Sequence, residues 1–564
     1  MNIEINKKLL TVAIASATLL SACGGSSSDE DSAVTNPAAS APSTLTRIAT
    51  IPLGAELTGI TKTDNGELFF NLQHPSQTLP LDESKAAIGA WIGVDFNNLP
   101  STINAVPVPD PTSAAAKTTQ VALGSYQVLG REGDDFAGGL PFGLGAIPNA
   151  ANNASIKQSN DPDFNAFIPS NIDGSEGYLF SAWEDRPGAM SRISLSKAGN
   201  SWIINDALNV DFSGVKGTMI NCFGSISPWG TPLTSEENYE AENTALWNDP
   251  SYTGGYPSYP DVQNIKDYLG GTFPNPYDYG YIVEITDPTG TPTPQKRFTL
   301  GRLAHENPII MPDEKTVYLT DDGSFKGFYK FVATTAGDLS AGTLYAAKLT
   351  QDAGITDSAD AGFDISWIEL GSSTDANIET FIDQYDGIDE TDLGVGSVSG
   401  STATSYVTDA DISAYAAGTG DEEIAFVETL RAAEAKGATV EFNKMEGINI
   451  NYDGASDGSV PFMYVAMAEV RNGMTDASGD IQVSENRCGI VYRFPLPTDF
   501  NVNRMEPVVV GGAYDGTSTA DRCDSNAIAQ PDNVAVLNDG RILIGEDSSN
   551  HKNNMMWLFK PAGI

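Results

Sequence analysis

Histidine and cysteine are scarce in this sequence, which has three histidines and four cysteines in 564 residues. His74, His305 and His551 are too few and too widely spaced for a histidine-based zinc signature. The sequence also lacks a glycine-rich phosphate-binding loop that ends in Lys-Ser or Lys-Thr, and it lacks a convincing nucleophile elbow. These absences argue against a zinc enzyme of that type, a nucleotide-dependent enzyme and a serine hydrolase.

Basic residues are also few, because 31 Lys and Arg stand against 74 Asp and Glu, for a net charge of −43. Binding to nucleic acid needs a basic face, so this balance argues against a nucleic-acid partner. It fits an extracellular protein kept soluble in salt, or a protein that binds divalent cations. A phosphate ester would be repelled by this charge unless bound cations reversed it locally.

Long apolar runs are absent, and the one notable run lies near the N-terminus, over residues 9–20. It is too short to span a bilayer, and two lysines precede it in the manner of a signal peptide. The lipobox-like sequence LSAC ends at Cys23 and is followed by Gly24 in place of an aspartate. We expect a lipoprotein signal peptide over residues 1–22 and lipidation of Cys23, which would anchor the chain to a membrane. The expected location is the outer membrane, the periplasm or the cell surface, and an ordinary secretory signal is the alternative.

Residues 23–45 are rich in Gly, Ser, Asp, Ala and Pro and hold too little apolar surface to fold, so we expect a flexible tether there. Residues 46–564 contain many short strand signals bounded by turn residues. This pattern favours an all-β fold, namely a β-propeller, with a pair of large sandwiches as the alternative. Residues 333–440 have few aromatics and are expected to form an elaborated insertion, with a helix over residues 421–436.

The cysteines favour one free thiol. If Cys23 is lipidated, then Cys222, Cys488 and Cys523 remain, and an odd number in an oxidising compartment leaves one unpaired. Pairing of Cys488 with Cys523 is one possibility. It would leave Cys222 as the free thiol, and a bound metal would protect that thiol from oxidation.

Cys222 is followed by a loop rich in Gly, Ser and Pro, then by Trp229 and the carboxylate pair Glu236 and Glu237. A thiol and two carboxylates combine soft and hard metal ligands. The alternative is a buried structural cysteine beside a solvated acidic turn. Acids also recur at strand ends, at Glu184-Asp185, Asp321-Asp322, Glu469 and Glu546-Asp547, and a propeller would bring such ends together at its central channel.

Several motifs occur in a particular order. They are Asn221-Cys222, Pro228-Trp229-Gly230-Thr231, Glu236-Glu237, the segment 301–306, the segment 319–322, the segment 442–447, Pro531-Asp532-Asn533 and the segment 540–547. In this order, over roughly residues 120–560, the sequence resembles the PhoX family of secreted alkaline phosphatases. The resemblance implies a six-bladed propeller, a central site with Fe³⁺ and Ca²⁺, and hydrolysis of phosphate monoesters.

The resemblance also implies site residues. Cys222 corresponds to the ligand of iron. The carboxylates that correspond to metal ligands are Glu184, Glu237, Glu306, Glu446 and Asp547. For Glu236, Asp322 and Asp532, ligation, support of a ligand and a plain turn role all stay open.

The sequence departs from the family before the central glutamate, where the usual Arg-Pro-Glu-Gly is replaced by Lys444-Met445-Glu446-Gly447. Lys444 keeps the positive charge but loses the bidentate geometry of arginine. Lys444 and Lys216 are the candidates for contact with phosphate, and a solvated turn lysine is the alternative for Lys444. Two other functions stay open: a calcium-dependent propeller hydrolase of phosphodiesters or lactones without iron, and a surface binding propeller without turnover.

Overall fold

The computed structural model describes residues 42–136, 139–238, 244, 246–252, 258–392 and 406–562. The expected signal peptide, the lipidation site Cys23 and nearly all of the expected tether lie outside these residues. Within the described ranges, no helix is both long enough and apolar enough to cross a membrane.

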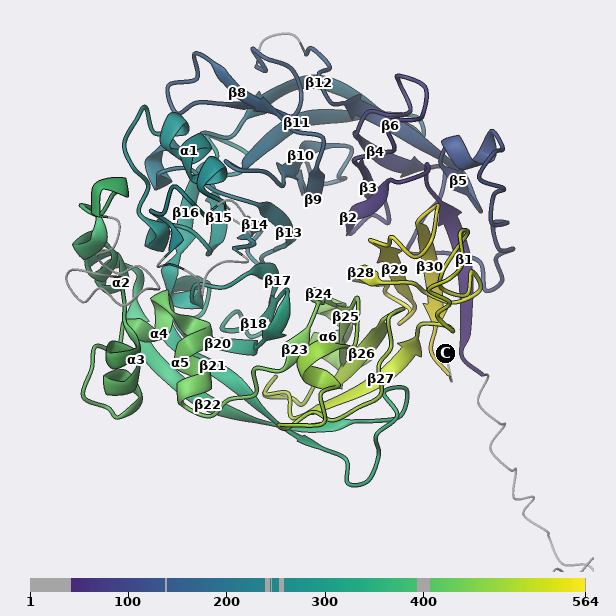
Figure 1. Cartoon of the computed structure of the whole chain (residues 1–564). Coiled ribbons are helices and arrows are strands. Elements are labelled where there is room, and N and C mark those ends of the chain that lie inside the picture. The colour runs from purple at the N-terminus through teal and green to yellow at the C-terminus, as the bar shows by residue number, and fades with distance from the viewer. Residues whose placement is uncertain are drawn as a thin grey trace, which may run out of the picture. The chain divides into compact units, whose positions relative to one another are not determined.

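Six antiparallel sheets form the blades of a β-propeller (Figure 1). Blade one consists of β2 (Glu56–Lys62), β3 (Leu68–Gln73), β4 (Ala87–Ile92) and β6 (Ser125–Arg131). Blade two consists of β9 (Pro162–Pro169), β10 (Glu176–Trp183), β11 (Ala189–Ala198) and β12 (Ser201–Asn209). Blade three consists of β13 (Asn221–Ile226), β14 (Pro232–Glu236), β15 (Ile282–Thr286) and β16 (Thr293–Arg297).

The other three blades complete the ring. Blade four consists of β17 (His305–Ile310), β18 (Thr316–Asp321), β20 (Phe328–Thr335) and β21 (Asp338–Gln351). Blade five consists of β24 (Met445–Ile450), β25 (Phe462–Met467), β26 (Ile490–Pro495) and β27 (Arg504–Val510). Blade six consists of β28 (Pro531–Val536), β29 (Ile542–Glu546), β30 (Met555–Lys560) and β1 (Thr44–Thr50).

One strand of each blade lines the central channel. These inner strands are β2, β9, β13, β17, β24 and β28, and together they form a closed ring. Each of β2, β9, β13, β17 and β24 contacts the next inner strand, and β28 contacts β2 again. Blade six joins both ends of the folded chain, because β1 pairs with β30 from Thr44 opposite Lys560 to Thr50 opposite Met555. Closure of this kind leaves few exposed strand edges. The expected six-bladed propeller is therefore confirmed.

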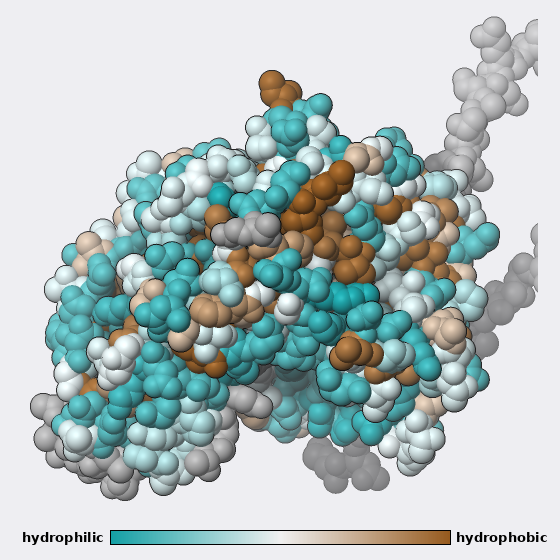
Figure 2. All heavy atoms as spheres, turned by 90° about the horizontal axis from the view of Figure 1, so that it is seen from above, coloured by the Kyte–Doolittle hydropathy of each residue, from teal (hydrophilic) through white to brown (hydrophobic). Residues whose placement is uncertain are grey.

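Each blade packs between two neighbours, so both faces of the two strands nearest the channel are buried. This burial explains why β25 (FMYVAM) and β29 (ILIGE) are almost continuously apolar instead of alternating. The outer surface is different: most side chains on the face shown in Figure 2 are hydrophilic, with smaller hydrophobic groups among them, in keeping with the net charge of −43.

The stretch 333–440, expected as an insertion, contains strands of the propeller itself. β21 pairs along β20, and β22 (Phe363–Thr374) pairs along β21 and also contacts β27, which joins blades four and five into one nine-stranded sheet. The helices α2 (Asp375–Ile382), α3 (Asp409–Ala416), α4 (Ile424–Val427) and α5 (Thr429–Ala435) follow. Because the stretch as a whole has few aromatic residues, the sequence did not predict these two long strands.

The single helix expected over residues 421–436 is divided into α4 and α5. The break falls at Glu428, whose φ of −131° and ψ of 49° are not helical. Its carboxylate is buried, accepts a hydrogen bond from the Tyr277 hydroxyl at 2.8 Å and lies 3.2 Å from Arg431. A tertiary contact therefore interrupts a sequence that local helix signals favour.

Candidate metal centre

Each inner strand begins with a side chain that is able to bind a metal ion. The residue is the first of β2 and the second of the other five strands: Glu56, Asp163, Cys222, Glu306, Glu446 and Asp532. Because all six inner strands run in the same direction along the channel, their first residues meet at one end of it. All six side chains line a single cavity there.

β-Bulges lie next to four of these residues. The pairing register shifts between Cys222 and Gly224, between His305 and Pro308, between Met445 and Ile448, and between Pro531 and Val534. A bulge adds a residue to one strand and changes the direction of the nearby side chains. At these bulges, at the start of otherwise apolar strands, polar side chains point into the channel.

A second set of residues comes from the second strand of each blade, since antiparallel pairing returns that strand to the same end of the channel. The residues directly after β3, β10, β14, β18 and β29 are His74, Glu184, Glu237, Asp322 and Asp547, and all of them line the cavity. Blade five has Ala468 at this position. The expectation that acids at strand ends converge therefore holds for Glu184, Asp322 and Asp547. It is wrong for Glu469, which pairs with Arg471 and lies outside the cavity lining.

The cavity has a volume of about 340 Å³ and an unusual excess of acids. Its carboxyl groups belong to Glu56, Asp161, Asp163, Glu184, Asp185, Glu237, Glu306, Asp322, Glu446, Asp532 and Asp547. Against these eleven, the lysine and arginine side chains in the lining are only Lys157, Arg186 and Lys444.

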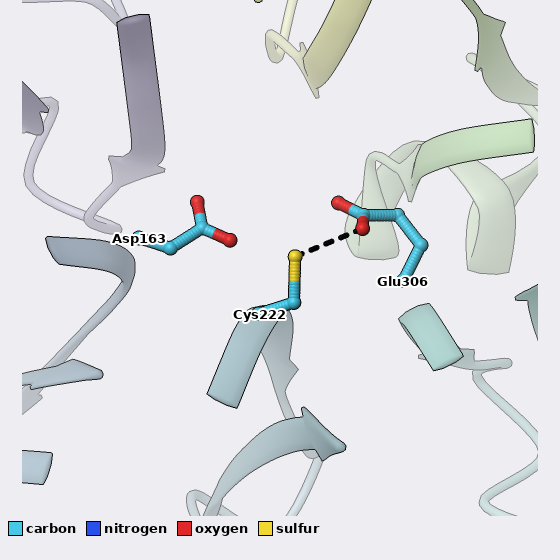
Figure 3. A group of neighbouring side chains, drawn as sticks. All are labelled: Asp163, Cys222 and Glu306. Carbon is cyan, nitrogen blue, oxygen red and sulfur yellow. Dashed lines mark hydrogen bonds between the residues drawn. The ribbon is translucent and has the colours of Figure 1, made fainter. Parts of the chain in front are cut away.

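Donor atoms form three groups within which all atoms lie less than 4.8 Å apart. The groups are Asp163–Cys222–Glu306, Glu184–Cys222–Glu237 and Glu306–Glu446–Asp532. Figure 3 shows Asp163, Cys222 and Glu306 pointing toward one another, and the Cys222 thiol donates a hydrogen bond to Glu306 Oε2 at 2.9 Å. The two groups that contain sulfur suit a transition metal, and the group of carboxylates alone suits a hard cation such as Ca²⁺.

The protonation equilibria of these groups also favour bound cations. Burial, followed by repulsion from neighbouring acids, raises the pKa values of Cys222, Glu237 and Glu306 well above their ordinary values. The carboxyl groups of Glu237 and Asp322 are close neighbours, and their repulsion contributes to the raised pKa of Glu237. Like charges buried together are unfavourable without a counter-charge. The residues present therefore fit a site for metal ions.

Lys444 forms ion pairs with two acids of the cavity. Its ammonium lies 2.6 Å from Asp322 Oδ2 and 3.3 Å from Glu446 Oε1. Burial alone would lower the pKa of Lys444, but the carboxylates of Asp322, Glu446 and Glu237 raise it well above its usual value. The side chain therefore carries a positive charge, and it lies inside the cavity rather than at a solvated turn.

The site residues predicted from the sequence fall into two groups, those that line the cavity and those that do not. Cys222, Glu184, Glu237, Glu306, Glu446, Asp547, Asp322, Asp532 and Lys444 line the cavity. Glu236 and Lys216 do not belong to its lining.

Glu236 belongs to the packing between β14 and the segment before β15. Its Oε2 accepts hydrogen bonds from the backbone N–H groups of Gly280 and Tyr281, and its Oε1 lies 3.1 Å from Lys296 Nζ. Successive residues of an extended chain point to opposite sides, so Glu236 turns away from the channel where Glu237 turns into it. The Lys216 ammonium lies 3.0 Å from Asp278, which is also outside the cavity lining.

Sequence reasoning missed several residues of the cavity, namely Glu56, His74, Lys157, Asp161, Asp163 and Arg186. Glu56 and Asp163 carry a recognisable signal, since each is an acid at the start of a strand that the chain then continues with apolar residues. His74 and Lys157 carry no such signal, because they lie in connections whose course depends on the fold.

The remaining cysteines form a disulfide between Cys488 and Cys523, and Cys222 is a buried free cysteine. The disulfide joins the connection between β25 and β26 to the connection between β27 and β28, at the same end of the channel as the cavity. The pairing that the cysteine count left as one possibility is confirmed.

The chain is similar to several known proteins. The family model described as alkaline phosphatase PhoX matches residues 182–561. PhoX from Pseudomonas fluorescens, solved in complex with vanadate, a transition state analogue, is 19% identical with a TM-score of 0.50, over 74% of this chain and 80% of that chain. The soluble aldose sugar dehydrogenase of Escherichia coli, in its apo form, is 8% identical with a TM-score of 0.38, over 92% of this chain and 99% of that chain. No curated protein matches the sequence. Because the family model covers most of the chain, this protein belongs to the PhoX family of alkaline phosphatases and is a phosphate-ester hydrolase.

Proposed function

We propose that the protein hydrolyses phosphate monoesters outside the cytoplasm, with ferric iron and calcium held at one end of the propeller channel. The observation that carries this proposal is the convergence of six strand starts, each with a carboxylate or a thiol, on one cavity. A buried set of eleven carboxyl groups is consistent with multivalent cations as its partners.

The donor sets suggest how the metals divide. Cys222, with Asp163, Glu306, Glu184 and Glu237 around it, would hold iron, because a thiolate prefers a transition metal to calcium. Glu446 and Asp532, together with Glu306, would hold calcium. When bound, such cations offset the negative charge of the ester and of the charge that develops during phosphoryl transfer.

Lys444 would contact the transferred phosphoryl group. Asp322 holds its ammonium in place at 2.6 Å, and about a third of the side chain (35%) is exposed. An ammonium has three N–H donors, so it is able to keep its contact with Asp322 and donate to a phosphate oxygen at the same time. This role needs no arginine, although a lysine contact has less geometric specificity.

Export through a lipoprotein signal peptide, with lipidation of Cys23 and attachment to a membrane, remains part of the proposal because of the N-terminal sequence. The disulfide between Cys488 and Cys523 supports an oxidising compartment. The proposed location is the outer membrane, the periplasm or the cell surface.

The test combines elemental analysis of the purified protein with hydrolysis of p-nitrophenyl phosphate, with and without added calcium. We expect iron and calcium in the protein and turnover that depends on calcium. Cys222→Ala should lose iron and activity together, whereas a control with Cys488→Ser and Cys523→Ser should keep its iron.

Full activity of an iron-free Cys222→Ala protein would overturn the assignment of iron. Calcium without iron in the active wild-type protein would instead support the calcium-dependent hydrolase. Bound metal with no turnover of any ester would indicate the binding propeller.

A further inference from the structure

Positively charged side chains line the cavity on two sides. Lys444 precedes β24 of blade five, while His74, Lys157 and Arg186 come from blades one and two and from the hairpin between them. That hairpin consists of β7 (Ala146–Pro148) and β8 (Ser155–Gln158), and it carries Lys157 on β8. Blades two and five are opposite members of the ring of six, so this basic set and Lys444 belong to opposite sides of the cavity.

Lys157 is positioned by a buried carboxylate. Its ammonium forms an ion pair with Asp185 Oδ1, and the same oxygen accepts the backbone N–H of Arg186 at 2.7 Å. The Asp185 side chain is 3% exposed, whereas the Lys157 side chain is 48% exposed. One end of the contact is therefore fixed, and the ammonium keeps further N–H donors toward the cavity and solvent.

The surroundings of Lys157 contain both basic and acidic side chains. His74 contacts the Gly54 carbonyl oxygen through Nδ1 at 3.2 Å and Glu56 Oε1 through Nε2 at 2.7 Å. Asp161 lies close enough to His74, Lys157 and Arg186 to interact with all three charges. Lys157 and Arg186 share this part of the lining with His74 and with the carboxyl groups of Glu56, Asp161, Glu184 and Asp185.

Most of this set lies outside the part of the chain that matches the family. The match begins at residue 182, after His74 and after the whole β7–β8 hairpin. The features that identify the chain as a phosphatase therefore do not include Lys157. The cavity volume of about 340 Å³ falls within the range of about 300–1,000 Å³ that small-molecule pockets occupy, so it has room for more than a phosphoryl group.

We propose that Lys157 is a specificity-determining residue that binds a second anionic group, on the alcohol part of the substrate, opposite the phosphoryl group held near Lys444. The preferred substrates are then phosphate monoesters that carry a carboxylate or another anion near the ester. This inference rests on the proposed phosphatase function and adds a substrate class to it.

A matched pair of esters tests it: 3-phosphoglycerate and glycerol 3-phosphate share a three-carbon backbone, and only the first has a carboxylate. We expect the wild-type protein to have the higher kcat/KM for 3-phosphoglycerate. Lys157→Ala should lower that value about tenfold, mainly through KM, as expected for loss of one charge-assisted hydrogen bond. The value for glycerol 3-phosphate should change less than twofold, Lys157→Arg should restore the preference, and the metal content should stay constant.

Lys348→Ala is the matched control, because the Lys348 ammonium forms a comparable ion pair with Asp480 at 2.7 Å, is 39% exposed and lies outside the cavity lining. It should leave both esters unaffected. An equal loss on both esters in Lys157→Ala, or no change on either, overturns the inference.

Equilibrium binding separates this inference from the phosphatase proposal. If the metal-loaded wild-type protein hydrolyses neither these two esters nor p-nitrophenyl phosphate, the phosphatase proposal fails. Calorimetry with the same two esters then still decides the role of Lys157. Tighter binding of 3-phosphoglycerate that Lys157→Ala abolishes supports the inference, and equal binding of both esters by the wild-type protein overturns it.

Discussion

The two ends of the central channel are built from the same six inner strands and have opposite chemistry. At the end where the strands begin, acids and Cys222 surround a cavity of about 340 Å³. Where the strands end, a second cavity of about 720 Å³ is lined by apolar side chains such as Phe164, Phe223 and Ile309, together with amides such as Asn165 and Asn449. A single strand therefore supplies a metal-binding side chain at one end and an apolar wall at the other.

Local backbone geometry accounts for much of this difference. Beyond the bulges, β24 pairs regularly with β25 from Ile448 to Ile450, and β28 pairs regularly with β29 from Val534 to Val536. Regular pairing alternates side chains between the two faces of a strand, and in a packed blade those faces are apolar. Polar ligands therefore concentrate at the irregular starts of the strands. The comparison shows that each inner strand contributes to the site at its start and to the packed core further along its length.

The largest expected effect comes from Glu306, which belongs to two of the three donor groups. Loss of a residue that only supports a metal ligand lowers activity roughly 10–100-fold. Glu306→Ala removes a proposed ligand itself, so it should lower activity by more than this and should reduce the bound iron and calcium. Elemental analysis and hydrolysis of p-nitrophenyl phosphate measure both effects. Ile309→Val, on the same strand at the apolar end, should cost about 0.5–1.5 kcal/mol of stability and leave the metals in place. Retention of both metals and of full activity in Glu306→Ala would contradict the comparison.

Lys444 should have the next largest effect. Lys444→Ala should raise KM about tenfold or more without changing the metal content, because it removes a charge-assisted hydrogen bond to the substrate. Lys444→Arg should recover the loss, since a guanidinium binds phosphate through two N–H groups. Lys62 is the control at the other end, where it lines the larger cavity and contacts Asn97 at 2.9 Å. If steady-state kinetics give Lys444→Ala the same KM as Lys62→Ala, then Lys444 has only a structural role.

Removal of metal should make the stability of the acidic end depend on pH. Burial raises the pKa of Glu184 from 4.5 to about 7 in the folded chain, so the folded state binds more protons than the unfolded state in that window. The stability of the metal-free protein should therefore fall as pH rises from 4.5 through about 7. We expect the Tm of the chelated protein to be at least about 2 °C higher at pH 5 than at pH 7.5, measured by calorimetry.

Glu184→Gln is the matched variant for this measurement, because it removes one titrating carboxyl from the cavity. Its metal-free form should have a smaller difference in Tm between the two pH values. The same slope in the variant and in the wild-type protein would place the pH dependence elsewhere in the molecule.

The smallest effect is expected at Ser225, three residues after Cys222 in β13. Its Oγ is buried, lines the apolar end of the channel and has no hydrogen-bond partner among the described residues. Ser225→Ala should change stability by no more than about 0.5 kcal/mol in denaturant unfolding and should leave metal content and activity unaltered. Loss of iron in this variant would show that the two ends of the channel are coupled.

Much of the site was predictable from the sequence, since the ordered motifs alone place Cys222, Glu306 and Glu446 in it. The fold class also followed from many short strands. The long strands β21 and β22 were not predicted, because polar residues and glycines interrupt their apolar residues. Pairing of β21 with β20 and β22, and of β22 with β27, stabilises them. The amino-acid composition of a segment does not show which distant strand it will pair with.

The sequence by itself determined the chemical types available: four cysteines, an excess of acids and few cations. Only the tertiary structure decided which of them meet. Glu236 and Glu237 are neighbours of the same type, yet one packs against Lys296 and the other enters the cavity. Extended backbone turns adjacent side chains to opposite sides, and closure of the ring brings distant strand starts to one place. Neither effect is visible in the order of the residues alone.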